Sequence, residues 1–183
     1  IPALTKHEPD EITAEVIQLV EEYYGENFGT TQDFGYAVAR SQALRQLEDF
    51  IEHRLRDFGS FQDALVDGEP FLFHSNVSLY LNNGLLMPRE VCDRAAEAYY
   101  QGGAPLNSVE GFIRQILGWR EFVLIYYEAL MPGVRRANEL NLTEKLPDLY
   151  WTADTEMACM RDSVDAVIQH GHSHHIQRLM VLR

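Results

Sequence analysis

Residues 156–183 read EMACMRDSVDAVIQHGHSHHIQRLMVLR, and this stretch governs how the rest of the chain is interpreted. It contains one of the two cysteines and four of the seven histidines. Its last part sets His174, His175 and Arg178 among apolar residues, a pattern that favours a helix entering a mostly apolar core. Imidazole and guanidinium groups are costly to bury unless something pairs with them. The stretch therefore predicts a polar guest inside the fold.

The composition is that of an ordinary globular protein of 183 residues, with 46% hydrophobic and 11% aromatic residues. This length allows one large domain or two small ones with a proper core. Two cysteines, Cys92 and Cys159, do not describe a disulfide framework. The chain shows no N-terminal signal segment, and no apolar run approaches the roughly 18 residues of a membrane span. We therefore expect a soluble protein of the reducing cytoplasm.

The net charge of −13 argues against a nucleic-acid partner, because phosphate binding depends on Lys and Arg. The charge is unevenly distributed: residues 1–110 carry 7 basic and 19 acidic side chains (−12), and residues 111–183 carry 8 basic and 9 acidic (−1). A DNA-binding patch is therefore expected in the second part, where Arg135 and Arg136 form a clear basic pair. Charge alone favours the alternative, an acidic surface without a nucleic-acid partner.

Helical spacing of apolar residues recurs along the chain, and no segment alternates strongly enough for a strand. Helices are expected at residues 9–24, 40–57, 88–101 and 108–130, and Gly171 should interrupt the helical pattern of the last stretch. The apolar face of the longest helix predicts that much of it is buried. The fold class is therefore all-α, and without a βαβ pattern a Rossmann-type nucleotide domain is excluded.

Ser75, Asn76 and Ser78 gather hydroxyl and amide groups where a helix is expected to begin. Backbone N–H groups exposed at a helix start favour an anion. Simple N-capping by the same side chains is the alternative that the local sequence favours.

The histidines at 170, 172, 174 and 175 suggest a metal site, but Gly171 interrupts the helix and no HExxH motif or carboxylate triad accompanies them. Hydrogen bonding in a core or cleft is the commoner role of such histidines. Cys92 lies on a helix rich in small residues and is interpreted as a packing cysteine.

Four segments resemble a known family. The string HHIQRLMVL, with Cys159 fifteen residues before His174, is similar to the deoxyribodipyrimidine photolyase-related proteins, which are bacterial (6-4) photolyases and cryptochromes with an iron–sulfur cluster. HSNVSLYL and GLLMPR resemble the family's TSxLSPYL and GxLSPR segments, which hold the flavin diphosphate. QILGWREF resembles the family's QLLWREF pattern, which lies against flavin and lesion.

The resemblance implies an all-α, multi-helix FAD-binding domain. It assigns the FAD phosphates to Ser75, the backbone of Val77, and Ser78. It places Gln115 at the cavity, although the glutamine lies one residue further from the tryptophan than in the family pattern. It sets Arg178 beside the isoalloxazine ring, where a guanidinium stabilises the negative charge of reduced flavin.

The resemblance also implies catalytic and redox roles. His174 and His175 would donate a proton to the lesion base, a role that suits imidazole because its pKa is ordinarily near neutrality. Cys159 would be the first of four thiolate ligands to a four-iron cluster, and Trp151 would transfer electrons inward. His74 stands where the family has threonine, so its role is not assigned by the resemblance.

The resemblance covers nearly the whole chain, and the family continues on both sides of it. Residues 1–183 are therefore expected to be a single helical domain fragment that ends inside a helix at Arg183. The α/β domain with its antenna chromophore and the helices with three further cluster cysteines would lie outside it. Half a pocket forfeits preorganisation, so the chain alone is expected to bind FAD weakly or not at all.

In the intact protein, light-excited reduced FAD would transfer an electron to a pyrimidine dimer flipped out of damaged DNA. Two alternatives stay open. One is a cryptochrome-type blue-light photoreceptor with the same flavin but without repair. The other is a flavin-free helical interaction module, for which the acidic first part of the chain is the best argument.

Overall fold

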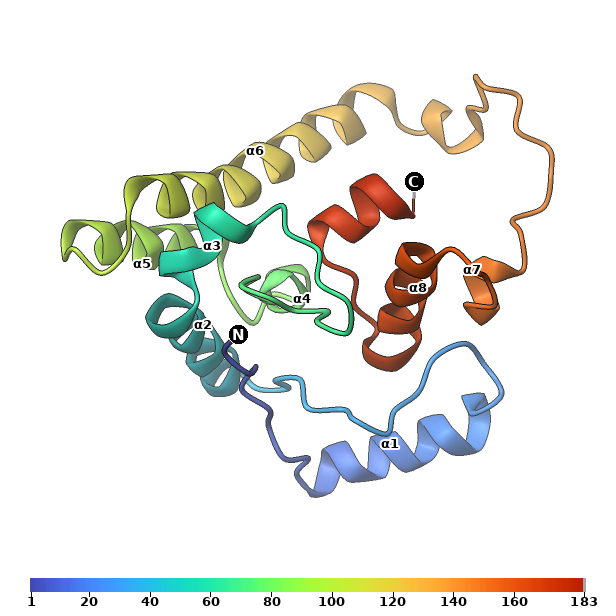
Figure 1. Cartoon of the computed structure of the whole chain (residues 1–183), viewed down its shortest axis with the longest axis horizontal. Coiled ribbons are helices and arrows are strands. Elements are labelled where there is room, and N and C mark those ends of the chain that lie inside the picture. The colour runs from blue at the N-terminus through green and yellow to red at the C-terminus, as the bar shows by residue number, and fades with distance from the viewer. Residues whose placement is uncertain (183) are drawn as a thin grey trace.

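The computed structural model describes residues 1–182, and every regular element within that range is helical, as the sequence predicts (Figure 1). Arg183, where the chain was expected to end inside a helix, lies outside the described residues. No helix in the described range is long and apolar enough to cross a membrane. The elements are α1 (Glu11–Tyr24), α2 (Arg40–His53), α3 (Leu55–Phe61), α4 (Ser78–Asn82), α5 (Pro88–Tyr100), α6 (Leu106–Leu130), a 3-10 turn (Gly133–Arg136), α7 (Leu149–Thr152), α8 (Ala158–His170) and a π-helical turn (Gln177–Val181).

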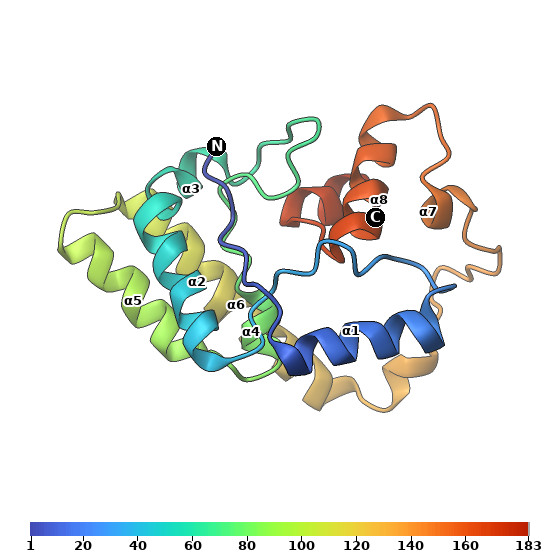
Figure 2. The same cartoon turned by 90° about the horizontal axis from the view of Figure 1, so that it is seen from below.

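The hydrophobic core lies among α2, α3, α5 and the first half of α6, which pack side by side (Figures 1 and 2). Phe50 is completely buried, and its ring centroid lies 4.7 Å from that of Phe112 and 6.1 Å from that of Phe58. Burying a side chain of this size contributes about 1.5–3 kcal/mol. Cys92 packs against this cluster from α5, as expected.

The expected continuous helix over residues 40–57 is wrong, because the chain turns at Arg54 between α2 and α3. The Arg54 side chain is fully buried and forms an ion pair with Asp49. Its Nη1 also lies 3.5 Å from the carbonyl oxygen of His74, a long hydrogen bond. Apolar spacing does not reveal this turn, since Leu55 and Phe58 continue the helical pattern beyond it.

Gly59, which follows the expected helix end at residue 57, lies inside α3 at the contact with α6. A Cβ atom there would come within 2.7 Å of the backbone nitrogen of Ser108. The Ser108 hydroxyl accepts a hydrogen bond from the Gly59 N–H at 2.9 Å and donates one to the Arg56 carbonyl at 2.9 Å. Glycine therefore permits the two helices to approach closely.

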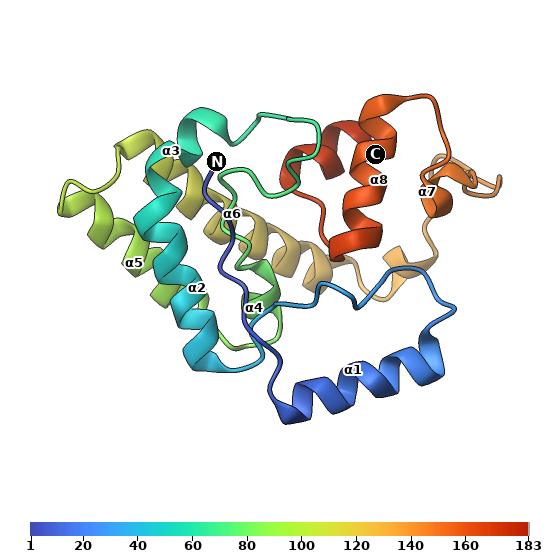
Figure 3. The same ribbon diagram turned by 60° about the horizontal axis from the view of Figure 1, so that its bottom comes forward.

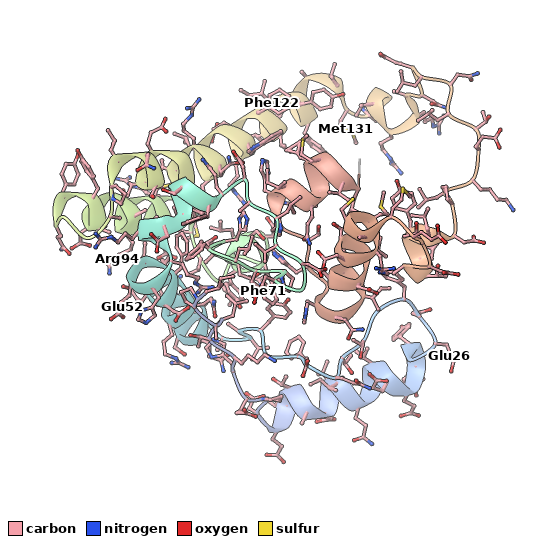
Figure 4. All side chains as sticks on the ribbon, viewed as in Figure 1. Glu26, Glu52, Phe71, Arg94, Phe122 and Met131 are labelled. Atoms are coloured by element: carbon pink, nitrogen blue, oxygen red, sulfur yellow. The ribbon has the colours of Figure 1, made fainter. Side chains whose placement is uncertain are left out.

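The prediction that much of α6 is buried is wrong for its second half, which extends beyond the core (Figure 1). The large apolar side chains from Leu117 to Leu130 are 45–63% exposed. Phe122, labelled in Figure 4, is one of them. The apolar face is present as predicted, but no other element of residues 1–182 covers it fully.

Helix α1 likewise buries none of its residues. The carboxylate of Asp10 caps it by accepting the Thr13 N–H at 2.8 Å. The helix stands apart from the α2–α5 bundle (Figures 2 and 3), and Ile12 and Val16 on its apolar stripe are 72% and 52% exposed. The chain thus has one well-packed end and two helices with uncovered apolar faces.

The last stretch does not enter the hydrophobic core, contrary to the sequence-based expectation. Gly171 ends α8 with φ at +58°, and the chain then reaches the π-helical turn. His174 and Gln177 are buried, whereas Met180 is 74% exposed and Arg178 is exposed. The stretch therefore buries polar side chains, and the cavity beside it explains why.

Candidate functional site

Four separate segments line one cavity of about 1060 Å³: α3 and its end, the loop before α4 together with α4, the middle of α6, and the stretch after Gly171. Aromatic and aliphatic side chains of α6, among them Phe112, Trp119 and Leu124, form one wall. Seven of the residues assigned from the sequence meet here, namely Ser75, Val77, Ser78, Gln115, His174, His175 and Arg178.

The serine-bearing turn does not serve as a helix cap. Helix α4 begins at Ser78 with Val77 in the N-cap position, and no side chain caps it. The Val77 N–H lies 3.5 Å from the Ser75 hydroxyl oxygen, a weak contact at best. The simple N-capping alternative is therefore wrong. Helix α4 has only five residues, so its dipole is not an argument for anion binding. The polar groups that the turn offers to a ligand are the hydroxyls of Ser75 and Ser78.

Four histidines line the same cavity, one from the loop before α4 and three from the stretch after Gly171. The rings of His74 and His174 are stacked, with centroids 4.7 Å apart and planes inclined by 14°. The ring of His172 stacks on Phe71 at 5.3 Å; Phe71 is labelled in Figure 4. His74, His172, His174 and His175 all line the cavity.

Three of these imidazoles carry buried nitrogen atoms without a hydrogen-bond partner in residues 1–182: His74 Nε2, His172 Nε2 and His174 Nδ1. Leaving a buried polar group unsatisfied costs about 1–3 kcal/mol. The commoner role expected from the sequence, a histidine satisfied by hydrogen bonds, does not describe these atoms. They are suited to a polar ligand in the cavity.

Burial lowers the pKa of His174 to about 4 and that of His172 to about 4, and nearby positive groups including Arg178 contribute. Burial also lowers the pKa of His74 to about 3 and shifts the pKa of His175 downward. The imidazoles of the cavity are therefore neutral at pH 7. The ordinary imidazole pKa that made histidine suitable for the catalytic role is thus lowered by burial for both His174 and His175.

Gln115 lines the cavity from α6, and Arg178 lines it from the π-helical turn. Within the described part of the chain, no carboxylate forms an ion pair with Arg178, so its guanidinium can meet a ligand. Trp119 is 49% exposed and lines the cavity, which makes it a wall residue rather than a core residue.

Four residues assigned from the sequence do not line the cavity. Trp151 is on α7, 55% exposed, and its ring meets that of Phe28 edge-on at 5.8 Å. Arg135 and Arg136 are exposed in the 3-10 turn beyond α6. Cys159 is exposed near the start of α8. Their roles stay predictions.

The residues of the chain do not by themselves fit a four-iron cluster, which needs four ligands, ordinarily thiolates. Cys92 and Cys159, the two cysteines, lie on different helices. Across residues 1–182 no three His, Cys, Asp or Glu side chains are grouped as metal ligands. The assignment of Cys159 as one ligand therefore concerns groups outside this chain, and we derive no chemical step from it.

Sequence reasoning left His74 without a role and did not place His172 in the site. The signal for His74 was its position directly before the serine turn, where the family pattern has threonine. For His172 no sequence signal was available, because its place depends on the contact with Phe71, 101 positions away in the chain.

Comparison with known proteins finds similar sequences and a similar solved structure. No family model matches the chain. It is 47% identical over 173 residues to a (6-4) photolyase of Agrobacterium fabrum, covering 94% of this chain and 34% of that protein. It is 30% identical over 112 residues to an uncharacterized protein of Acanthamoeba polyphaga mimivirus, covering 61% of this chain and 85% of that one.

A bacterial class III photolyase from Agrobacterium tumefaciens has the same fold over 94% of this chain and 33% of its own, with a TM-score of 0.64 at 19% identity. The chain thus spans about a third of the length of both photolyases. The chain belongs to the (6-4) photolyase family.

Proposed function

We propose that this chain is the FAD-binding helical part of a light-dependent enzyme that repairs (6-4) photoproducts in DNA. The observation that carries the proposal is the convergence of the serine turn, Gln115, the histidine pair and Arg178 on one cavity. The family membership supports the same function.

The cavity suits FAD in size and in the distribution of its polar groups. Its volume of about 1060 Å³ is slightly above the roughly 300–1,000 Å³ typical of ligand sites, as suits a large cofactor. Ser75 and Ser78 would hold the diphosphate by donating hydroxyl hydrogen bonds, while Arg178 would lie beside the isoalloxazine ring. FAD, when bound and reduced, supplies the electron that light excites.

His174 and His175 would handle the proton that accompanies this electron. In the resting site both rings are neutral, because burial depresses the pKa of each. A negative charge that develops on a bound base favours the protonated imidazole beside it and so raises the pKa. His174 Nδ1, buried without a partner in the described chain, would carry the proton.

Damaged DNA is the proposed partner. With a net charge of −13, the protein must contact phosphates locally, and the exposed Arg135 and Arg136 are the proposed contacts. The aromatic wall formed by Trp119 and Tyr127 suits a base flipped out of the duplex. A damaged base costs less to flip than an intact one.

The longer protein would supply what the chain lacks. We infer an N-terminal α/β domain with an antenna chromophore and further helices with three cluster cysteines, so that Cys159 becomes one of four ligands. Trp151, exposed and in contact with Phe28, would then carry electrons from the surface. The cytoplasm is the proposed location.

The test uses the full-length protein and an oligonucleotide that contains one (6-4) photoproduct. Blue light should restore the intact bases, and His175→Ala should abolish repair. His53→Ala is the matched control, since the side chain of His53 is 52% exposed and does not line the cavity. Bound flavin without repair would favour a photoreceptor. If the full-length protein shows no flavin absorption, even after addition of FAD, the proposal is wrong and an interaction module is favoured.

A further inference from the structure

The ring of His74 is held in place from more than one side. One face stacks on His174, and the edge-on ring of Phe58 lies 6.0 Å away, centroid to centroid. Behind it, the buried guanidinium of Arg54 lies within 3.5 Å of the His74 carbonyl oxygen and pairs with Asp49. The loop that carries His74 is thus fixed to the core, and the ring is fixed to the cavity.

The stacked ring of His74 covers one face of the His174 ring. Its side chain is 2% exposed, and its backbone N–H donates to Gln177 Oε1 at 3.1 Å. No hydrogen bond within residues 1–182 fixes Nδ1. The orientation of the ring about its side-chain torsions is therefore determined by packing, and the stacked ring of His74 is the aromatic contact that provides it.

The charged and titratable groups around His174 come from three elements. His172, His175 and Arg178 belong to its own segment, and His74 belongs to the loop before α4. Asp162 reaches it from α8 and favours its protonation. The Asp162 carboxylate also accepts the Gly68 N–H at 3.1 Å, which ties the same loop to α8.

We propose that His74 is a positioning residue that acts through His174: its ring covers one face of that imidazole, keeps water from it, and fixes the plane in which it meets the ligand. The consequence for proton transfer rests on the function proposed above. The stack itself does not depend on that function, because it is a contact between two side chains of this chain.

This role explains why an aromatic ring stands where the family pattern has threonine. A threonine side chain is too short to cover an imidazole face, so water would enter the space. Burial, together with the neighbouring His174, lowers the pKa of His74 to about 3, so its ring is neutral near pH 7. A neutral ring stacks on the imidazolium without repelling it.

The first test is an NMR titration of the histidine rings in the 183-residue chain, with the His174 signal assigned through His174→Gln. In His74→Thr the pKa of His174 should rise from about 4 toward the ordinary value of 6.5, because water reaches the ring. In His74→Phe, which keeps an aromatic cover, the pKa should stay where it is. An unchanged pKa in His74→Thr, or an equal rise in both variants, would overturn the proposal.

A matched control separates this effect from loosening of the loop. Phe73→Ala removes an aromatic ring from the same loop, one that stacks on Phe61 at 5.1 Å and not on a histidine. It should leave the pKa of His174 unchanged. If Phe73→Ala raises that pKa as much as His74→Thr does, loop order rather than the stack is responsible and the proposal is wrong.

The second test measures repair by the full-length protein across pH. His74→Thr should move to higher pH the limb of the repair profile that reflects the ionisation of His174, and His74→Phe should keep the wild-type profile. A profile that His74→Thr leaves in place would contradict the positioning role. If the wild-type protein does not repair at all, the function proposed above fails, and the NMR titration still decides whether His74 positions His174.

Discussion

The two ends of the molecule are stabilised in different ways. At the end formed by α2, α3, α5 and the first half of α6, apolar side chains are buried against one another and the rings of Phe50, Phe58 and Phe112 interlock. At the other end, apolar side chains of α6 are exposed, while imidazole nitrogen atoms are buried without a hydrogen-bond partner in residues 1–182. The first end is stabilised by apolar packing, whereas the second combines exposed apolar side chains with the polar lining of the cavity.

The contrast teaches that an amphipathic pattern predicts a helix more safely than it predicts what covers the helix. The first half of α6 buries Phe112 and Ile116 in the core, and the second half repeats the pattern over the cavity and beyond. Removing core contacts should therefore affect stability, whereas removing cavity contacts should affect ligand binding and proton uptake.

The largest expected effect compares two truncations. Phe50→Ala removes a fully buried ring and should lower the free energy of unfolding by about 3–5 kcal/mol. Ile125→Ala, at a site 63% exposed on the second half of α6, should change it by about 0.5 kcal/mol or less. Urea denaturation of the 183-residue chain measures both. Similar losses would mean that the second half of α6 is packed after all.

The next effect concerns the buried ion pair between Asp49 of α2 and Arg54 at the turn into α3, whose guanidinium also lies 3.5 Å from the His74 carbonyl oxygen of the cavity loop. Asp49→Ala leaves the guanidinium of Arg54 buried and unpaired, which should lower the free energy of unfolding by up to about 3–5 kcal/mol. The double variant Asp49→Ala/Arg54→Met should recover much of that loss, because no uncompensated charge remains. Denaturation of the single and double variants measures this. A double variant no more stable than Asp49→Ala would show that the pair itself stabilises the fold.

A smaller effect is the pH dependence of stability that the cavity confers. Above pH 6.5 His174 is neutral in both the folded and the unfolded chain and contributes nothing. As the pH falls from 6.5 to about 4, the unfolded chain binds a proton that the folded chain does not, so stability decreases. For a ring as buried as this one the loss is on the order of 2–3 kcal/mol.

Denaturation of the wild type and of His174→Gln between pH 4 and pH 7 measures this loss. The variant should show a flatter dependence, with the difference confined to the interval between the two pKa values of His174. A parallel course of the two curves would contradict the assignment of a depressed pKa to this ring.

The smallest effect on the fold is expected from the basic pair. Arg135→Ala/Arg136→Ala should change the stability of the chain by about 0.5 kcal/mol or less, since both side chains are exposed. In the full-length protein the double variant should weaken DNA binding. The slope of the logarithm of the binding constant against the logarithm of salt concentration should fall by the amount expected for about two lost phosphate contacts. Binding measured at several salt concentrations is the readout. An unchanged slope would remove these residues from the DNA interface.

The sequence predicted the helical class and the bounds of α1, α5 and α6 to within about two residues, and the family resemblance singled out the seven residues that line the cavity. Apolar spacing and the flanking Pro and Gly residues were sufficient for α5, which begins at Pro88 as expected. The turn at Arg54 was missed because it depends on a buried ion pair, and the exposure of α6 was missed because spacing does not reveal what lies opposite a face. The depressed pKa values follow from burial, which only the tertiary structure shows.

The central claim is that the hollow between the serine turn and the histidines holds FAD, and it can be tested with two adjacent residues of the full-length protein. Ser78 lines the cavity, whereas Leu79, next to it on α4 and 42% exposed, does not. The account predicts that Ser78→Trp purifies without the visible absorption of flavin and that Leu79→Trp retains it at the wild-type level. Full flavin content in Ser78→Trp, or its loss in both variants alike, would contradict the account.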